Sequence, residues 1–129
     1  MAAAGAIAAV WATAAAAGAT GVWATVHGEA LPPELCRGAV ARGLGILAGT
    51  MSMWEEAIGH FDEAIAMNDR MGARAWLAHT RYDYAFVLAT RGRAEDAGRT
   101  RDLIASATTL AHRLGMPALS GKLAVLSAS

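Results

Sequence analysis

Apolar residues recur along much of this chain at intervals of three and four positions, a spacing that predicts amphipathic α-helices. The clearest stretch covers residues 53–71, whose apolar face collects Trp54, Ala57, Ile58, Phe61, Ala64, Ile65 and Asn68. The acidic residues of that stretch lie away from this face: Glu55, Glu56, Asp62, Glu63 and Asp69. The pattern therefore predicts a helix with one buried side and one solvated side.

The same spacing predicts further helices on either side of this stretch. A helix at about 33–49 would bury Cys36, Val40, Leu44 and Leu47. A helix at about 73–91 would direct inward Trp76, Leu77, Thr80, Tyr84, Val87 and Leu88. The next, at about 94–114, would bury Ala97, Leu103, Ile104, Ala107, Leu110 and Leu114. A short last helix at about 117–127 would bury Leu119, Leu123 and Leu126.

Turn residues separate the predicted helices. Pro33 suits the first turn of a helix, where its missing N–H is not needed. Ser52 is predicted to cap the helix at 53–71, with Glu55 three residues later as its capping-box partner. Three helices are expected to end at a residue that adopts the left-handed conformation easily, namely Gly72, Gly92 and Gly115.

The order of elements predicts an all-α fold. No stretch alternates like a strand, and helices joined by so few residues pack antiparallel. We expect a helical domain over 32–129, with hairpins at about 33–71 and 73–115 and a terminal helix at about 117–127. Residues 1–31 form a separate alanine-rich segment, for which a helix is expected.

The first predicted hairpin resembles a tetratricopeptide repeat (TPR). In the first helix the resemblance rests on two adjacent residues, Leu44 and Gly45. In the second helix it rests on small and aromatic residues, namely Trp54, Ala57, Phe61 and Ala64. Small residues at Gly45 and Ala57 would let the two helices approach closely. In the second hairpin Ile104 and Ala107 take the places of Phe61 and Ala64, but at a spacing of 43 residues. The second hairpin is therefore a lengthened, degenerate repeat, since the usual spacing is about 34 residues.

Longer runs resemble one group of proteins more specifically. Residues 54–85, 88–93 and 112–116 are similar to the C-terminal TPR-like region of large bacterial regulators, which join an ATPase module to a LuxR-like DNA-binding, adenylate cyclase or kinase domain. This resemblance covers roughly 37–126. It implies a TPR-like right-handed α-solenoid fragment, at the end of a longer chain, that serves protein–protein interaction or scaffolding. It carries over no catalytic residue.

The inner surface of a TPR array is lined mainly by the first helix of each hairpin. The candidate contacts with a protein or peptide partner, or with a neighbouring domain, are therefore Arg42, Ile46, Trp76, Arg81 and Tyr82. Two repeats are fewer than the three or so that usually suffice for stability. We therefore expect the isolated chain to be marginally stable, or to bind a partner or a copy of itself.

Charge is balanced over the chain but unevenly distributed. Eleven basic and eleven acidic residues cancel, so no overall field favours nucleic acid, and direct DNA binding is not expected. Between Glu29 and Asp69 there are seven acidic residues, whereas nine basic residues lie between Arg70 and Lys122. This asymmetry predicts ion pairs between neighbouring helices; the alternative is an acidic or nucleic-acid ligand for the second half.

The start of the chain leaves a second function open. Residues 1–26 carry no charge and are long enough to cross a bilayer, but alanine, glycine and threonine dominate them. The alternative is therefore a membrane-associated helical-repeat protein anchored by residues 1–26. Cys36 is the sole cysteine, which excludes a disulfide framework and favours a reducing, cytoplasmic compartment.

The sequence predicts no enzyme, cofactor or metal. Residues 43–48 satisfy a dinucleotide-binding fingerprint, but no buried strand precedes them. Glu56, His60 and Glu63 share a helix face with the spacing of metal ligands, yet such a face is more typical of a solvated surface. His79 and Asp83 form a similar isolated pair. No phosphate-binding loop or nucleophile motif is present.

Overall fold

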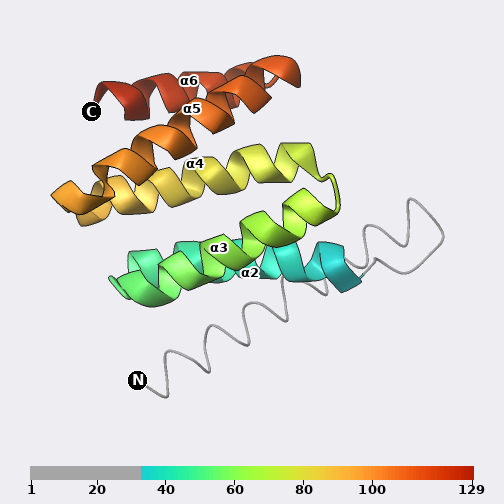
Figure 1. Cartoon of the computed structure of the whole chain (residues 1–129), viewed down its shortest axis with the longest axis horizontal. Helices are drawn as coiled ribbons and strands as arrows, with labels where there is room; N and C mark the ends of the chain where they lie inside the picture. Colours follow the sequence, from blue (N-terminus) through green and yellow to red (C-terminus); the bar gives the residue numbers. More distant parts are fainter. Residues whose placement is uncertain (1–32) are drawn as a thin grey trace.

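The computed structural model describes residues 33–129, and this part of the chain is entirely helical between its turns (Figure 1). Its five α-helices and one 3-10 helix are α2 (Pro33–Thr50), α3 (Trp54–Arg70), α4 (Arg74–Arg91), η1 (Ala94–Asp96), α5 (Ala97–Arg113) and α6 (Pro117–Ala128). The predicted all-α class is confirmed, and the helix boundaries agree with the predicted ones to within a few residues. Residues 1–31, including the suggested anchor, lie outside the described part.

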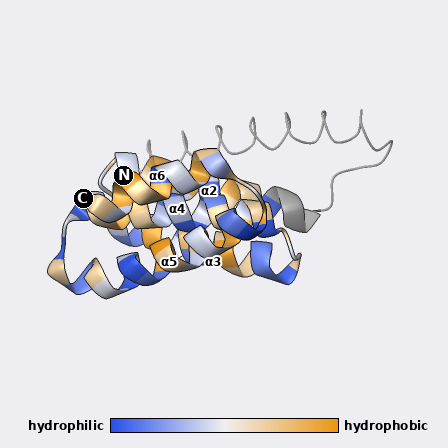
Figure 2. Ribbon diagram, turned by 90° about the horizontal axis from the view of Figure 1, so that it is seen from above, coloured by the Kyte–Doolittle hydropathy of each residue, from blue (hydrophilic) through white to orange (hydrophobic). Residues whose placement is uncertain are grey.

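Consecutive helices pack antiparallel in two layers. The closest pairs are α2 with α3 and α4 with α5, and α4 also contacts both α2 and α6. Seen from above, α2, α4 and α6 lie on one side of the molecule, and α3 and α5 lie on the other (Figure 2). The layer of α2, α4 and α6 therefore presents one continuous face that none of the described helices covers. No described helix is both long and apolar enough to cross a membrane.

Phe61 is the centre of the core that joins the first four helices. Its side chain is fully buried, and its ring stacks on Tyr84 of α4, with the centroids 5.2 Å apart. A Cβ atom built on Gly45 of α2 would lie 3.0 Å from three carbons of that ring. Leu103 of α5 is buried in the same cluster. Helix α2 therefore approaches α3 closely because position 45 lacks a side chain.

A second cluster joins the last three helices. It is built from small and aliphatic residues of α4, α5 and α6, namely Leu77, Ala78, Ala107, Leu110, Ala111, Leu119 and Leu123. Ile65 and Ile104 pack against both clusters, so the two form one continuous core.

A buried polar contact joins α3 to α4. The amide of Asn68 donates to the hydroxyl of Thr80 at 3.2 Å, and that hydroxyl donates to the carbonyl of Trp76 at 2.8 Å. Asn68 is 2% exposed and Thr80 is fully buried, as the predicted helix faces required. Since buried polar groups without partners are costly, this pair favours a single register between the two helices.

The helix ends confirm the glycine predictions and correct the prediction for Ser52. Gly72, Gly92 and Gly115 all adopt positive φ angles, as predicted. Ser52 also has a positive φ, of 59°, and its N–H donates to the carbonyl of Gly49 while that of Met53 donates to Ala48. These two bonds form a Schellman motif, in which Ser52 ends α2. Met53 stands at the N-cap of α3 and makes no side-chain capping bond, so the predicted capping box with Glu55 is wrong.

Replacing Ser52 with glycine is expected to stabilise the protein by about 0.5–1 kcal/mol, because a left-handed backbone is strained for a residue with a Cβ atom. The matched substitution Gly72→Ser, at a φ of 64° with open space around it, is expected to destabilise by a similar amount. Urea unfolding of both variants measures these shifts. If both substitutions changed the free energy of unfolding in the same direction, this explanation would be contradicted.

Three predicted inward positions are wrong. Trp76 is 45% exposed and Leu114 is 42% exposed, and Ala97 is also exposed. Trp76 lies on the side of α4 that faces away from α3 and α5, where no described helix covers it. Leu114 follows the last residue of α5, and Ala97 starts that helix beside an open groove. Helical spacing alone could not reveal which residues of each apolar helix face lack a neighbouring helix.

The acidic surface of α3 pairs with basic residues of its neighbours, which confirms the predicted ion pairing between helices. Glu63 lies 3.8 Å from Arg37 of α2, Glu55 accepts a 2.8 Å hydrogen bond from Arg91 of α4, and Asp62 accepts one of 2.7 Å from Arg99 of α5. Both partners of the Arg37–Glu63 and Arg99–Asp62 pairs are about half exposed or more, so each of these two pairs contributes little by itself. The side chain of Arg91, by contrast, is buried.

Candidate protein-binding face

One surface of the described chain gathers aromatic and charged side chains from alternate helices. We call it the α2–α4–α6 face and define it by Arg42, Ile46, Trp76, His79, Tyr82, Asp83, Phe86 and Lys122. Trp76, His79, Asp83 and Phe86 recur on α4 at spacings of three and four, so they share one side of that helix. Arg42 and Ile46 reach this side from α2, and Lys122 reaches it from α6.

The apolar part of the face is unusually exposed. Ile46, Trp76 and Phe86 are 39%, 45% and 52% exposed, although each is large and apolar. The rings of Tyr82 and Phe86 lie 6.3 Å apart. Since gathered apolar side chains at a surface often mark an interaction site, this cluster is the strongest binding candidate on the described chain.

An ion pair holds α2 against α4 in the middle of the face. The guanidinium of Arg42 donates to the carboxylate of Asp83 at 2.6 Å, and both side chains are largely buried. The same guanidinium lies 5.7 Å from the centre of the Trp76 ring. The guanidinium of Arg42 therefore interacts with both the carboxylate of Asp83 and the indole of Trp76, and the second contact restricts the motion of the indole.

At the other edge of the face, α6 contributes a positive charge. The ammonium of Lys122 lies 5.9 Å from the centre of the Tyr82 ring. His79 lies between the two cations along α4, with its ring centre 6.5 Å from that of Trp76. Two cations, Arg42 and Lys122, thus lie over the rings of Trp76 and Tyr82.

A small pocket opens between α2 and α4 on this face. Its volume is about 130 Å³, and it is lined by Ile46, Gly49, Thr50, Trp54, Asp83, Phe86, Val87 and Thr90. Such a space suits one side chain of a bound peptide rather than a cofactor, because cofactor pockets are several times larger.

Burial shifts the pKa of two titratable groups on the face. The pKa of Asp83 is raised because desolvation of the carboxylate outweighs the attraction of Arg42. The pKa of His79 is lowered, first by burial and then by the positive charge of Arg42, while Asp83 acts in the opposite sense and Lys122 adds to the lowering. His79 is therefore neutral near pH 7.

We expect the pKa of His79 to make stability depend on pH. Because the folded protein binds this proton less readily than the unfolded chain, whose histidine has the ordinary pKa of 6.5, stability should fall as pH drops below that value. Urea midpoints compared at about pH 7.5 and pH 5.5 should fall less for His79→Gln than for wild type. Equal pH dependence of the two proteins would contradict this.

Four of the five predicted groove residues meet on this face: Arg42, Ile46, Trp76 and Tyr82. Arg81 does not. It lies on the opposite side of α4, in a pocket lined also by Asn68, Asp69 and Leu110. Arg81 is two positions from both His79 and Asp83, and residues two apart on a helix point in nearly opposite directions. The prediction missed His79, Asp83, Phe86 and Lys122; the first three could have been found from their helical spacing to Trp76.

The residues that carried the repeat resemblance lie in the helix contacts. Ala57, Phe61, Ala64 and Ala107 are fully buried, and Gly45 is buried against Phe61. Trp54 and Ile104 are half-buried against the core. Leu44 is half-buried and lines a pocket together with Arg37 of α2 and Glu63 of α3. These side chains build the helix packing rather than the exposed face.

The described residues offer no metal-binding cluster of three or more His, Cys, Asp or Glu side chains. Glu56 and Glu63 are exposed on α3, and Glu63 is paired with Arg37. The glycines of residues 43–48 lie within α2, where a phosphate-binding fingerprint would need a turn after a strand.

The geometry thus gives an all-helical domain of five packed helices with one exposed aromatic face. No protein-family model, curated protein or solved structure matches this chain, and the domain is therefore assigned by its architecture alone.

Proposed function

We propose that this chain is a non-catalytic protein-interaction module that holds a segment of a partner protein on its α2–α4–α6 face. The observation that carries the proposal is the gathering of Ile46, Trp76 and Phe86 on that face, each more than a third exposed. Exposed aromatic side chains of this kind supply much of the binding energy at protein interfaces.

The way the face is built supports binding rather than catalysis. The contact between Arg42 and Asp83 spans α2 and α4, and Lys122 lies over Tyr82 from α6, so ordered contacts from three helices meet on this face. A face that is already ordered loses little side-chain entropy when a partner binds. Its charged groups are ion-paired or lie over aromatic rings, with Arg42 on Asp83 and Trp76 and Lys122 on Tyr82.

The proposal includes a TPR-like right-handed solenoid as the framework. Its support is the alternation of the helices between two layers, together with the small residues at the first hairpin contact, Gly45, Ala57 and Ala64. In such an array the inner surface comes from the first helix of each hairpin, and here those helices are α2 and α4. The terminal helix α6 lies in the same layer.

We further propose that the module is one part of a longer bacterial signalling or transcriptional regulator. The support is the resemblance of residues 54–85 to the helical region of such proteins. In that setting the partner is a regulatory protein or a neighbouring domain of the same chain. The alternative anchor concerns residues 1–26 and rests on their lack of charge alone.

Site-specific photo-crosslinking tests the face. A photoreactive phenylalanine analogue at Phe86 is expected to capture a discrete protein in cells, whereas the same analogue at Leu114, which is comparably exposed but lies off the face, is not. The captured protein, once purified, should bind Trp76→Ala at least about tenfold more weakly than wild type. Equal capture from both positions, or unchanged affinity of Trp76→Ala, would refute this function.

A further inference from the structure

A second candidate site lies on the side of α4 that faces away from the α2–α4–α6 face. A pocket of about 200 Å³ opens there, where the turn between α3 and α4 meets α5. Its walls include Arg74 and Arg81 of α4, Leu110 of α5, and Asn68 and Asp69 at the end of α3. Pockets that hold cofactors measure about 300 Å³ or more, so this one suits a single chemical group.

Two arginines of this pocket differ from most other arginines of the described part in their charge partners. Five arginines form ion pairs with carboxylates, namely Arg37, Arg42, Arg91, Arg93 and Arg99. Arg74 and Arg81 form none with a described side chain, although Asp69 lines the same pocket. Because a guanidinium group does not lose its proton in proteins, the pocket carries two cations for one carboxylate.

The two arginines lie on the same side of α4. Arg74, Leu77 and Arg81 are separated by three and four residues, so their side chains leave the helix in one direction. The Cα atoms of the two arginines are about 10 Å apart, a distance that two long side chains span from both ends. Leu77 lies between them and is buried against α5 together with Leu110. Both guanidinium groups can therefore reach one ligand placed over Leu77.

The wall of the pocket on the α3 side is built from a buried polar residue. Asn68 is 2% exposed, and its amide donates to the hydroxyl of Thr80 at 3.2 Å. Gly72, with a φ of 64°, then reverses the chain toward α4. This wall is ordered by contacts within the fold, so a ligand would bind without ordering it first.

We propose that this pocket binds a phosphate group, held between the guanidinium groups of Arg74 and Arg81. Arginine binds phosphate and carboxylate groups through paired hydrogen bonds. A phosphate group suits two arginines better, because it carries about −1.5 to −2 charges near pH 7 and has more acceptor oxygens than a carboxylate. Asp69 is exposed, so water screens its repulsion of the anion. The site is separate from the α2–α4–α6 face and does not depend on the function proposed for it.

Titration of the isotope-labelled full chain with sodium phosphate, followed by NMR at constant ionic strength, tests the site. The backbone amide signals of Gly72, Arg74 and Leu77 should shift and saturate, with a dissociation constant of about 1 mM or below. Arg74→Gln and Arg81→Gln should each raise this constant at least about tenfold, because each removes one charged donor group. The NMR spectra of the variants also show that they fold.

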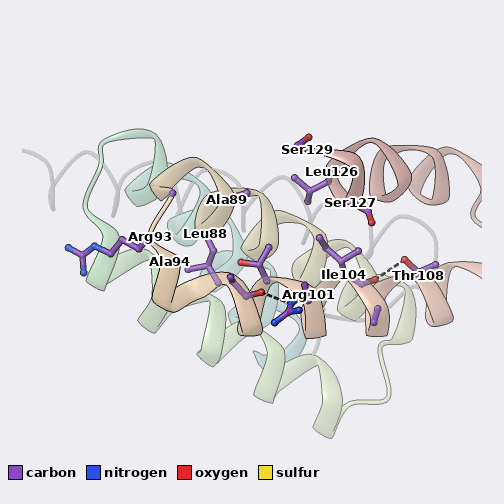
Figure 3. A pocket seen from close by; sticks show the side chains of 14 residues that line it. Leu88, Ala89, Arg93, Ala94, Arg101, Ile104, Thr108, Leu126, Ser127 and Ser129 are labelled. Atoms are coloured by element: carbon purple, nitrogen blue, oxygen red, sulfur yellow. Dashed lines mark hydrogen bonds between the residues drawn. The ribbon is translucent and has the colours of Figure 1, made fainter.

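The matched control is Arg101→Gln. Arg101 is also exposed and forms no ion pair with a described side chain, but it lines a wider groove beside α6, between that helix, α4 and α5 (Figure 3). This variant should leave the dissociation constant unchanged. Shifts that do not saturate, or an equal loss of affinity in Arg101→Gln and Arg81→Gln, would overturn the proposal.

Two further ligands define the chemistry of the bound group. Sodium acetate should bind at least about tenfold more weakly than phosphate, and equal affinity would overturn the choice of phosphate over carboxylate. Phosphoserine presents the same group on a larger molecule. Tighter binding of phosphoserine than of inorganic phosphate would support a phosphorylated ligand, and equal binding would support the free anion.

Discussion

Replacing Phe61 with alanine is expected to destabilise the protein by about 3–5 kcal/mol, a large share of the stability of a domain of this size. The phenyl ring is fully buried and stacks on Tyr84, and its removal leaves a cavity at the point where α2, α3 and α4 meet. Gly45 offers no side chain that could refill the space. Urea unfolding followed by circular dichroism measures the loss.

The chain supplies its own control for this substitution. Phe86 is the second of two phenylalanines, and it is 52% exposed on the α2–α4–α6 face. Phe86→Ala should change stability by no more than about 0.5 kcal/mol, because about half of that side chain is already in contact with water. If the two substitutions cost the same, Phe61 is not the centre of the core.

Replacing Gly45 with valine is expected to destabilise by about 2–3 kcal/mol through overpacking. A Cβ atom at this position would lie 3.0 Å from three carbons of the Phe61 ring, closer than almost any real contact. The ring cannot retreat, because Tyr84 lies against it. Helix α2 would have to move away from α3, and thermal or urea unfolding would register the lost contact.

A second substitution tests whether the clash itself is the cause. In a Phe61→Leu background the smaller side chain leaves room, so Gly45→Val should cost less there than in wild type, by about 1 kcal/mol or more. Gly59→Val, at an exposed position with open space, should cost close to nothing. Additive costs of Gly45→Val and Phe61→Leu would argue against a direct contact between the two positions.

These substitutions separate stability from binding. The residues that hold the helices together, such as Phe61 and Gly45, lie in the contact between the two layers. The residues proposed to bind a partner, Trp76 and Phe86, lie on the outer side of α4. Because the two sets lie on different sides of the helices, a variant such as Trp76→Ala can weaken binding while the fold persists.

Much of the architecture could be read from the sequence. The three-to-four spacing located every helix of residues 33–129, and Gly72, Gly92 and Gly115 marked helix ends, because both signals depend on local backbone geometry. The first hairpin contact was also foreseeable, since the small residue Gly45 and the aromatic Phe61 fit one another only at a close crossing. Four of the five candidate contacts that the TPR resemblance implied, Arg42, Ile46, Trp76 and Tyr82, lie together on the α2–α4–α6 face.

Only the tertiary structure decided which residues of each apolar helix face are covered by a neighbouring helix. Trp76 and Leu77 are neighbours in sequence, yet Leu77 is buried by α5 and α6 while Trp76 faces away from the core. Ser52 ends α2 instead of capping α3 because the tight turn at 51–53 needs a left-handed residue there. The pairing of Arg42 with Asp83 and the groove beside α6 likewise depend on contacts between residues far apart in the chain. Sequence periodicity determines where a helix has an apolar side, and packing determines what that side meets.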